Sequence, residues 1–222
     1  MDGKRRGLVA VNPAEDVPLK DVGNGVERFL SEDEERRLRK VIERDIAACD
    51  PDRHPELRKQ AIHRLIEFEV SLKSGMRRSE QFNLRWEDVD FKRRIMRLRM
   101  TKNGKPRNAF IIEDVRVALL RLKDLDTHRR AMKDGKVADK NLVFAKAENK
   151  KWWAAALSDA EIENYRWHDN RHTFCSRLVQ AGVHLKVVQE AAGHASLAST
   201  LRYAHFAPSQ VVDAMAVLNQ VS

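Results

Sequence analysis

The sequence is poor in the residues and runs that define several classes of protein. Only two cysteines, Cys49 and Cys175, occur among 222 residues, and they lie far apart. Such scarcity argues against a disulfide framework or a cysteine zinc site and favours a reducing compartment. No apolar run approaches the roughly 18 residues of a membrane span, and residues 1–19 lack the apolar segment of a signal peptide. We therefore expect a cytoplasmic protein without a membrane partner.

Acidic residues are outnumbered by basic ones. Lys and Arg total 42 against 33 Asp and Glu, which gives a formal net charge of +9. This excess favours a polyanionic partner such as nucleic acid, although charge alone fits a basic protein of ordinary function equally well. The chain is long enough for one large domain or two small ones with a real hydrophobic core.

Tyrosine is also scarce, and one of the two tyrosines has informative neighbours. Residues 167–205 contain His168, Arg171, His194 and Tyr203. An arginine can hold two phosphate oxygens at once, and a histidine can donate a hydrogen bond or transfer a proton near neutral pH. A phenol oxygen can attack phosphorus and hold it covalently. Together these groups suit phosphate chemistry without a metal ion or other cofactor.

The spacing of these residues resembles the second half of the tyrosine recombinase (phage integrase) signature. That family carries His-x-x-Arg, a later Gly-His, and a nucleophilic Tyr nine residues after that His. Here Arg171 precedes His194 by 23 residues, and Tyr203 follows His194 by 9. The first half of the signature is matched by residues 74–80, SGMRRSE, in which Ser replaces the usual Thr. The resemblance covers residues 28–210.

The resemblance implies roles for the basic cluster. Arg77, Arg171 and His194 would bind the non-bridging phosphate oxygens and stabilise the charge of the transition state. Glu80, three residues after Arg77, would orient these basic groups. Gly75 would let the backbone turn so that Arg77 can enter the site.

The resemblance also implies how protons move. Tyr203 would attack the DNA backbone, form a 3′-phosphotyrosine and free a 5′-hydroxyl. Lys102, in the turn TKNGKP of a predicted hairpin, would protonate the leaving oxygen. His168 would accept the tyrosine proton or hold the ring of donors in place. Rejoining would need no ATP, because the covalent intermediate keeps the energy of the phosphodiester.

The periodicity of the chain predicts an α+β fold that is mainly helical, with a small three-stranded antiparallel sheet. Ser31 and Glu34 form a capping-box pattern at the start of a first helix. Residues 86–112 alternate apolar and charged residues around a turn, which is typical of a hairpin. Further helices are expected over residues 55–73, 76–84, 114–132 and 208–218.

Domain organisation and partners follow from the same resemblance. Residues 1–28 are expected to be a linker or arm after a missing N-terminal core-binding domain, and residues 29–222 an integrase-type catalytic domain. Double-stranded DNA is the expected partner, bound by a homotetramer in which residues 207–222 dock on a neighbouring protomer. Accessory DNA-bending or directionality proteins would join it in a bacterial or phage-infected cell.

Three alternatives stay open. The first is a type IB topoisomerase-like enzyme that relaxes DNA, and the second is a DNA-binding protein of the same fold that does not cleave. The third is a metal site in which His168 and His172, four residues apart on a helix, join His194. A metal site would place the cation of Arg171 beside the ion and leave Tyr203 unexplained.

Several neighbouring residues are interpreted as structural. His172 is expected to be a packing or capping residue, and Arg78 to be solvated. Tyr165 is expected to be a core aromatic residue with its hydroxyl at the rim, and Trp152 and Trp153 to be packing residues.

Overall fold

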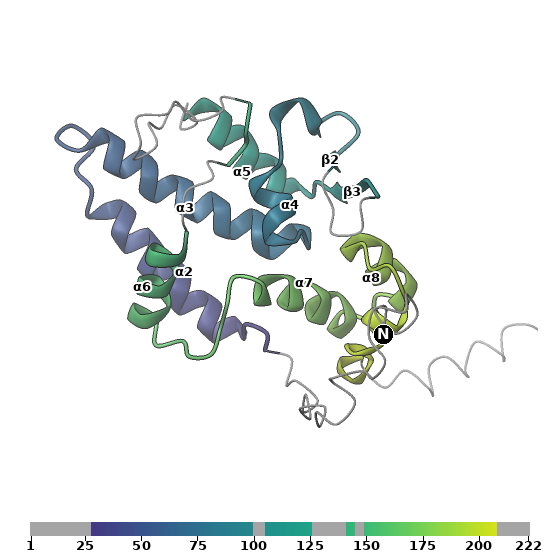
Figure 1. The fold of residues 1–222 in the computed structure, drawn as a ribbon. Coiled ribbons are helices and arrows are strands. Elements are labelled where there is room, and N and C mark those ends of the chain that lie inside the picture. Colours follow the sequence, from purple (N-terminus) through teal and green to yellow (C-terminus); the bar gives the residue numbers. More distant parts are fainter. Residues whose placement is uncertain (1–27, 100–104, 126–140, 145–148, 208–222) are drawn as a thin grey trace, which may run out of the picture.

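The computed structural model describes residues 28–99, 105–125, 141–144 and 149–207, which form a helical body with one small sheet (Figure 1). Its helices are α2 (Glu32–Ala47), α3 (Pro55–Ser74), α4 (Arg78–Phe82), α5 (Glu113–Asp124), α6 (Lys150–Asp159), α7 (Asp169–Gln180), α8 (Leu185–Ala192) and α9 (Ala198–Leu201), with the 3-10 turns η1 (Trp86–Asp88) and η3 (Ala204–Phe206). Of the helices in these segments, none is both long enough and apolar enough to cross a membrane.

The predicted three-stranded antiparallel sheet is confirmed. Strands β1 (Val89–Asp90), β2 (Ile95–Leu98) and β3 (Arg107–Phe110) lie in that order. Met96 lies opposite Val89 on one side and Ala109 on the other. Met96 and Ala109 are fully buried, so this face of the sheet closes the core while the arginine at the start of β3 remains available for other contacts.

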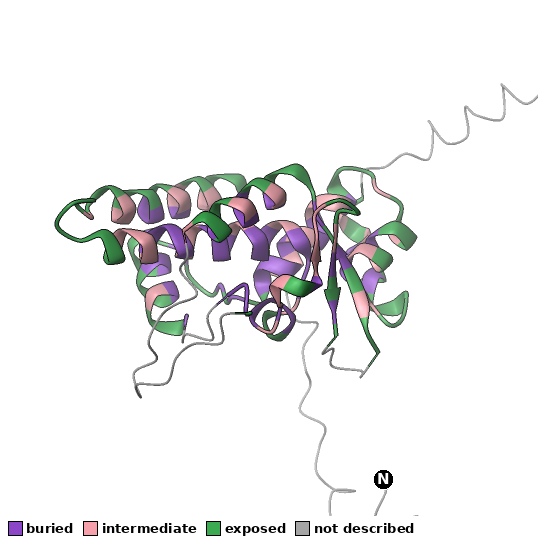
Figure 2. Cartoon of the chain, turned by 90° about the horizontal axis from the view of Figure 1, so that it is seen from above, coloured by how far each residue is buried: buried purple, intermediate pink, exposed green. Residues whose placement is uncertain are grey.

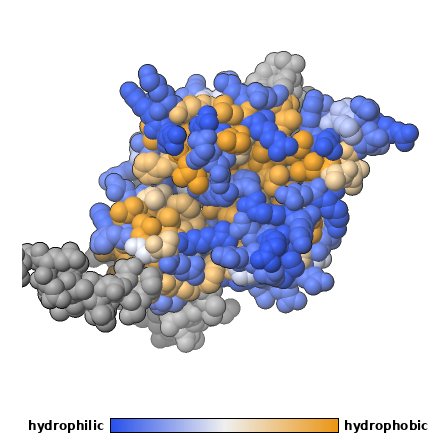
Figure 3. Space-filling view, turned by 180° about the vertical axis from the view of Figure 1, so that it is seen from behind, coloured by the Kyte–Doolittle hydropathy of each residue, from blue (hydrophilic) through white to orange (hydrophobic). Residues whose placement is uncertain are grey.

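Helix α3 is the centre of the fold, and α2, α5 and α7 pack against it (Figure 1). Its apolar stripe recurs every three or four residues, and Ile66, Phe68 and Leu72 are almost completely buried. In Figure 2 the ribbon is coloured as buried on the inner faces of the helices and as exposed on their outer turns. Seen from behind, much of the surface is hydrophilic, with apolar areas between the charged groups (Figure 3).

A second, smaller core supports the C-terminal part of the described chain. It consists of the side chains Cys175, Val179, Val188, Ala192 and Tyr203. Helix α7 contributes to this core and also packs on α3, so it connects the two halves of the body. The Tyr203 ring is therefore held by packing as well as by polar contacts.

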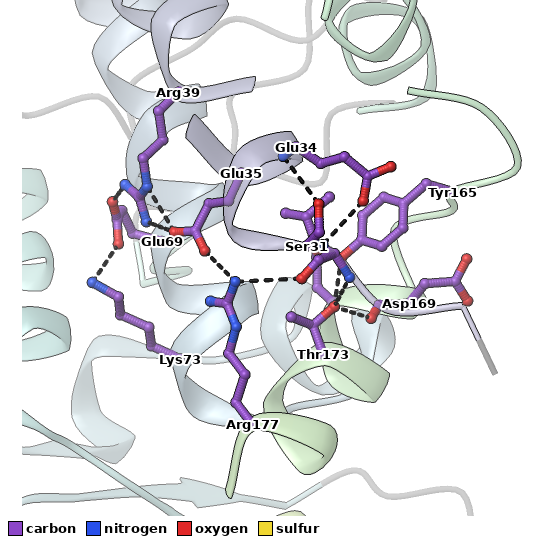
Figure 4. Close-up of polar contacts among 12 residues, drawn as sticks. Ser31, Glu34, Glu35, Arg39, Glu69, Lys73, Tyr165, Asp169, Thr173 and Arg177 are labelled. Carbon is purple, nitrogen blue, oxygen red and sulfur yellow. Dashed lines mark hydrogen bonds and ion pairs between the residues drawn. The ribbon is translucent and has the colours of Figure 1, made fainter. Parts of the chain in front are cut away.

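Polar contacts fix α7 against α2 and the residues before it, and join α2 to α3 (Figure 4). Arg177 pairs with Glu35 at 2.5 Å, and the Leu30 N–H donates to Thr173 Oγ1 at 2.9 Å. Glu69, on the edge of α3, binds Arg39 and Lys73 of the same chain. The Arg177 and Thr173 contacts hold α7, which carries Arg171 and His172 and directly follows His168, in a defined place.

The predicted helices agree with the structure where it describes them. Ser31 accepts a hydrogen bond from the Glu34 N–H at 3.2 Å, and the Glu34 carboxylate accepts one from the Ser31 N–H at 3.0 Å, so the capping box is confirmed. Helix α4 is shorter than expected. The predicted extension to residue 132 and the helix over residues 208–218 lie outside the described residues, as do residues 1–27.

One side-chain interpretation is wrong. The Tyr165 hydroxyl is not at the rim: the residue is 4% exposed, and its O–H donates to Asn170 Oδ1 at 2.7 Å. Arg78 is exposed, as expected, and it also donates to Asn149 Oδ1 at 2.9 Å and lies over the Phe82 ring. The packing role of the tryptophans is confirmed, with the Trp152 and Trp153 ring centroids 5.5 Å apart.

Candidate active site

The first arginine enters the site through a turn that only glycine suits. Gly75 ends α3 with φ +63°, and a Cβ atom there would lie 2.6 Å from the Phe174 ring. Both the left-handed backbone and the lack of space favour glycine. The chain then becomes extended at Arg77, directly before α4.

Glu80 is a buried carboxylate between two arginines. Its Oε1 accepts from Arg77 Nη1 at 2.8 Å, and its Oε2 accepts from Arg107 Nη2 at 2.7 Å. Burial disfavours the charged form, but the bonds from Arg107 and Arg77 outweigh it and hold the pKa of Glu80 below its ordinary value. The carboxylate therefore stays ionised and fixes both guanidinium groups.

Arg107 is a member of this cluster that the sequence does not predict. It begins β3, its side chain is 13% exposed, and it passes so close to Gly193 that a Cβ atom there would lie 2.3 Å from Arg107 Cδ. An arginine at the start of a strand gives no local sign that it folds back onto α4. Only the tertiary approach of the sheet, α4 and the end of α8 reveals it.

Arg171 lies in the first turn of α7 and is 4% exposed. Its Nη1 donates to the Gly75 carbonyl at 2.6 Å. Burial and the nearby charges of Arg77 and Arg107 lower the pKa of Arg171 to about 10, so it remains protonated at neutral pH. Three guanidinium groups thus share the neighbourhood of one carboxylate, an arrangement that favours an added anion.

His194 follows α8, which ends at Gly193 with φ +68°. Its Nδ1 lies 2.9 Å from Thr200 Oγ1. Burial and the charges of Arg171 and Arg77 lower the pKa of His194 to about 4, so the ring is neutral at pH 7. The ring is parallel to that of Tyr203, with the centroids 6.2 Å apart and 2° between the planes.

Tyr203 is 1% exposed, and its hydroxyl oxygen lies 2.6 Å from His172 Nδ1. His172, interpreted from the sequence as a packing or capping residue, does pack against the rings of His168 and Tyr203, and it also bonds the tyrosine hydroxyl. Burial, followed by the charges of His168 and Arg202, lowers the pKa of His172 to about 4. The sequence does hold a sign that His172 belongs to the site, because it follows His168 by four residues and this step places both rings on one helix face.

His168 directly precedes α7, and its ring centroid is 5.3 Å from that of His172. Burial and the charge of Arg171 lower its pKa. The structure thus brings together six of the seven predicted residues: Arg77, Glu80, His168, Arg171, His194 and Tyr203. The seventh, Lys102, lies between β2 and β3 in sequence but outside the described residues.

The metal alternative gains no geometric support. Within the described ranges, no three His, Cys, Asp or Glu side chains are grouped so that they could hold an ion. His172 and His194 instead have Tyr203 and Thr200 as hydrogen-bond partners.

Comparison with known proteins identifies relatives over most of the chain. The pattern of the phage integrase family matches residues 28–210. The integrase of Salmonella phage P22 is 34% identical over 155 residues, which are 65% of this chain and 40% of that protein. The shufflon-specific DNA recombinase of Escherichia coli is 29% identical over 208 residues, 93% of this chain and 47% of that protein. The chain therefore spans less than half the length of these two relatives.

Solved structures agree on the fold. The catalytic domain of bacteriophage HP1 integrase has a TM-score of 0.55 at 27% identity, covering 84% of this chain and 92% of that one. A crystal structure of XerA recombinase has a TM-score of 0.57 at 25% identity, covering 86% of this chain and 65% of that one. The α+β, mainly helical fold with its three-stranded sheet is that of a tyrosine recombinase catalytic domain.

Proposed function

The chain belongs to the phage integrase family, and from this membership we propose that it is the catalytic part of a site-specific DNA recombinase. It cleaves and rejoins double-stranded DNA through a covalent bond to Tyr203. The names of the relatives, an integrase and a shufflon-specific DNA recombinase, support this activity over relaxation of supercoils.

One observation carries the proposal: cations and a phenol from distant segments meet. The Tyr203 ring lies parallel to His194, and burial together with the neighbouring charges of Arg171 and Arg77 lowers the pKa of that same histidine. Segments 77–80, 168–172 and 194–203 therefore converge, with β3 joining them through its first residue. A phosphodiester is the anion that such a site would accept between a nucleophile and two guanidinium groups.

The proposed reaction moves atoms as follows. The Tyr203 oxygen bonds to phosphorus, and the bond from phosphorus to the 5′-oxygen breaks, which leaves a 3′-phosphotyrosine. The 5′-oxygen takes a proton from Lys102, a role assigned from sequence resemblance alone. Arg77 and Arg171 stabilise the extra charge on the non-bridging oxygens in the transition state. Attack by another 5′-hydroxyl reverses the step on a new strand, and no ATP or metal ion is consumed.

The decisive experiment captures the covalent adduct. The full chain is incubated with nicked duplexes whose central region is randomised, and complexes stable to sodium dodecyl sulfate are sequenced and mapped to the attached residue. The expected attachment is at Tyr203. Tyr203→Phe should abolish adducts and leave non-covalent binding nearly intact, whereas Tyr165→Phe, the matched change at the chain's other tyrosine, should still form them.

The outcomes separate the candidate functions. Selected sequences that contain paired inverted sites would favour a recombinase, while adducts without sequence preference would favour a topoisomerase-like activity. DNA binding without any adduct would leave a non-cleaving protein. Adduct formation should persist in EDTA, and a strict requirement for divalent ions would contradict the metal-independent step.

Assembly is part of the same proposal. Residues 29–222 form the catalytic domain, residues 1–28 an arm, and four copies assemble on two DNA sites in the cytoplasm of a bacterial or phage-infected cell, together with accessory DNA-bending or directionality proteins. Sedimentation with and without a selected duplex measures the copy number. Deletion of residues 207–222, which dock on a neighbouring protomer in this proposal, should reduce assembly on DNA.

A further inference from the structure

The hydroxyl of Tyr203 has a specific partner that the sequence motif does not assign. His172 Nδ1 lies 2.6 Å from the Tyr203 oxygen, a distance typical of a strong hydrogen bond between O–H and a ring nitrogen. The two ring centroids are 5.9 Å apart. With Tyr203 only 1% exposed, water has little access to this contact, so a proton that leaves the phenol needs an acceptor within the protein.

The surroundings of His172 keep a nitrogen lone pair available. Its ring is half-buried and meets the His168 ring nearly edge to face, at 88° between planes. Burial, followed by the charges of His168, Arg202 and Arg171, disfavours a cation here, while Asp169 favours one. The ring is therefore neutral without DNA, and a neutral imidazole has one nitrogen that accepts a proton.

Given the proposed function of Tyr203 as the nucleophile, we propose that His172 is a further catalytic residue, whose Nδ1 accepts the phenolic proton as the Tyr203 oxygen attacks phosphorus. The proton passes from oxygen to Nδ1 and leaves an imidazolium, while the leaving 5′-oxygen is protonated by a separate acid. On rejoining, the bond from phosphorus to Tyr203 breaks, and His172 returns the proton to the phenol.

A bound DNA phosphate makes the proton transfer from Tyr203 to His172 more favourable than it is in the DNA-free protein. Before DNA binds, Arg171 and Arg202 oppose a positive charge on His172. A phosphodiester bound by Arg77 and Arg171 brings a negative charge that offsets these cations and raises the proton affinity of the ring. His172 thus becomes a stronger base only when DNA is bound, which limits deprotonation of Tyr203 in the absence of DNA.

A test needs a substrate that separates the two proton transfers. In a duplex with a 5′-bridging phosphorothiolate, the leaving group is a thiolate that needs no acid. The probe is the nicked duplex selected by the wild-type chain, made with either oxygen or sulfur at the scissile position. Single-turnover rates of adduct formation are measured for His172→Asn, His172→Ala and Lys102→Ala, with His54→Asn, a change at an exposed histidine before α3, as the matched control.

The expected result is a loss of about 10²-fold for both His172 variants on both substrates, the size of a general-base contribution. DNA binding should be unchanged, and added imidazole should partly restore His172→Ala. Lys102→Ala should instead regain its rate on the sulfur substrate. Asparagine retains a hydrogen-bonding side chain but takes up no proton, so wild-type rates in His172→Asn would overturn the role.

Failure of this inference is distinct from failure of the proposed function. If wild type forms adducts at Tyr203 and both His172 variants match it, only the role of His172 is lost. If wild type forms no adduct on any selected duplex, the proposed recombinase activity fails first. Thermal melting of each variant ensures that rates are compared between folded proteins, and the asparagine variant serves where the alanine variant does not fold.

Discussion

Glu80 and Arg107 form a buried ion pair that joins α4 to β3. Arg107 Nη2 lies 2.7 Å from Glu80 Oε2, and Nε lies 3.3 Å from Oε1, so the guanidinium group meets both oxygens. The Glu80 side chain has no exposed surface. Because Arg77 binds the same carboxylate, the position of β3 is coupled to the orientation of a candidate phosphate ligand.

Replacing Arg107 should therefore affect both stability and activity. In Arg107→Gln the Glu80 carboxylate stays buried but loses one of its two charged partners, which should cost about 3 kcal/mol of unfolding free energy. Adduct formation should fall as Arg77 loses its fixed orientation. Urea unfolding measures the first effect, with Arg97→Gln, the same change at an exposed residue of β2, as the control. Equal unfolding midpoints in the two variants would contradict the importance of the pair.

Gly193→Ala should disturb the same pair from the other side. The backbone at Gly193 has φ +68°, where a side chain costs roughly 1–2 kcal/mol. The new methyl group would also push Arg107 away from Glu80, because it would overlap with the Arg107 side chain. Unfolding of the double variant Gly193→Ala with Arg107→Gln should show less destabilisation than the two single effects added together. Simple additivity would mean that the glycine does not act through Arg107.

The part of the fold that depends on near neighbours could be predicted from sequence. The start of α2 follows from Ser31 and Glu34 three residues apart, and the buried stripe of α3 from its helical period. The resemblance of their spacing to the tyrosine recombinase signature also predicted that Arg171, His194 and Tyr203 belong to one site. These inferences succeed because local propensity and the pattern of apolar residues agree with the final fold.

Contacts made across the fold could not be predicted. The hydrogen bond between His172 and Tyr203 depends on how α8 and α9 fold back onto α7. The ion pair of Arg107 with Glu80 depends on how the sheet meets α4. Tyr165 shows the same limit: its aromatic character predicted burial, but only the approach of Asn170 gives its hydroxyl a buried partner. A residue type indicates what a side chain can do, while its partner is decided by tertiary packing.

The capping box offers a test of local stability away from the site. Ser31→Ala removes the oxygen that accepts from the Glu34 N–H, which should lower the unfolding free energy by about 1 kcal/mol. Ser158→Ala, at an exposed serine within α6, should change it by less than about 0.5 kcal/mol. Chemical denaturation of both variants makes the comparison, and equal losses would show that the cap does not contribute.

Acid should destabilise the folded chain over two adjoining ranges of pH. The hydrogen bond from Arg28 is the main reason that the pKa of Glu34 lies at about 2 in the folded chain, against an ordinary value of 4.5. A carboxyl group with a lowered pKa contributes stability above its unfolded pKa and loses it as pH falls. The contribution of Glu34 should therefore disappear between pH 4.5 and 2. A Glu34→Gln variant should lose less stability than wild type across that range.

The buried histidines of the site affect stability at higher pH. Their protonation also destabilises the folded chain as the pH falls. Burial lowers the pKa of His172 and His194 to about 4 from an ordinary 6.5, so between these values the unfolded chain binds more protons than the folded one. Stability should then rise with pH from 4 to 6.5 and level off above. His172→Asn removes one of these groups and should flatten the rise in urea midpoints measured at constant ionic strength, relative to His54→Asn. Because a bound phosphodiester offsets the arginine charges that oppose protonation, a selected duplex should also flatten the rise in wild type. An unchanged slope in His172→Asn would mean that His172 does not titrate as a buried neutral ring.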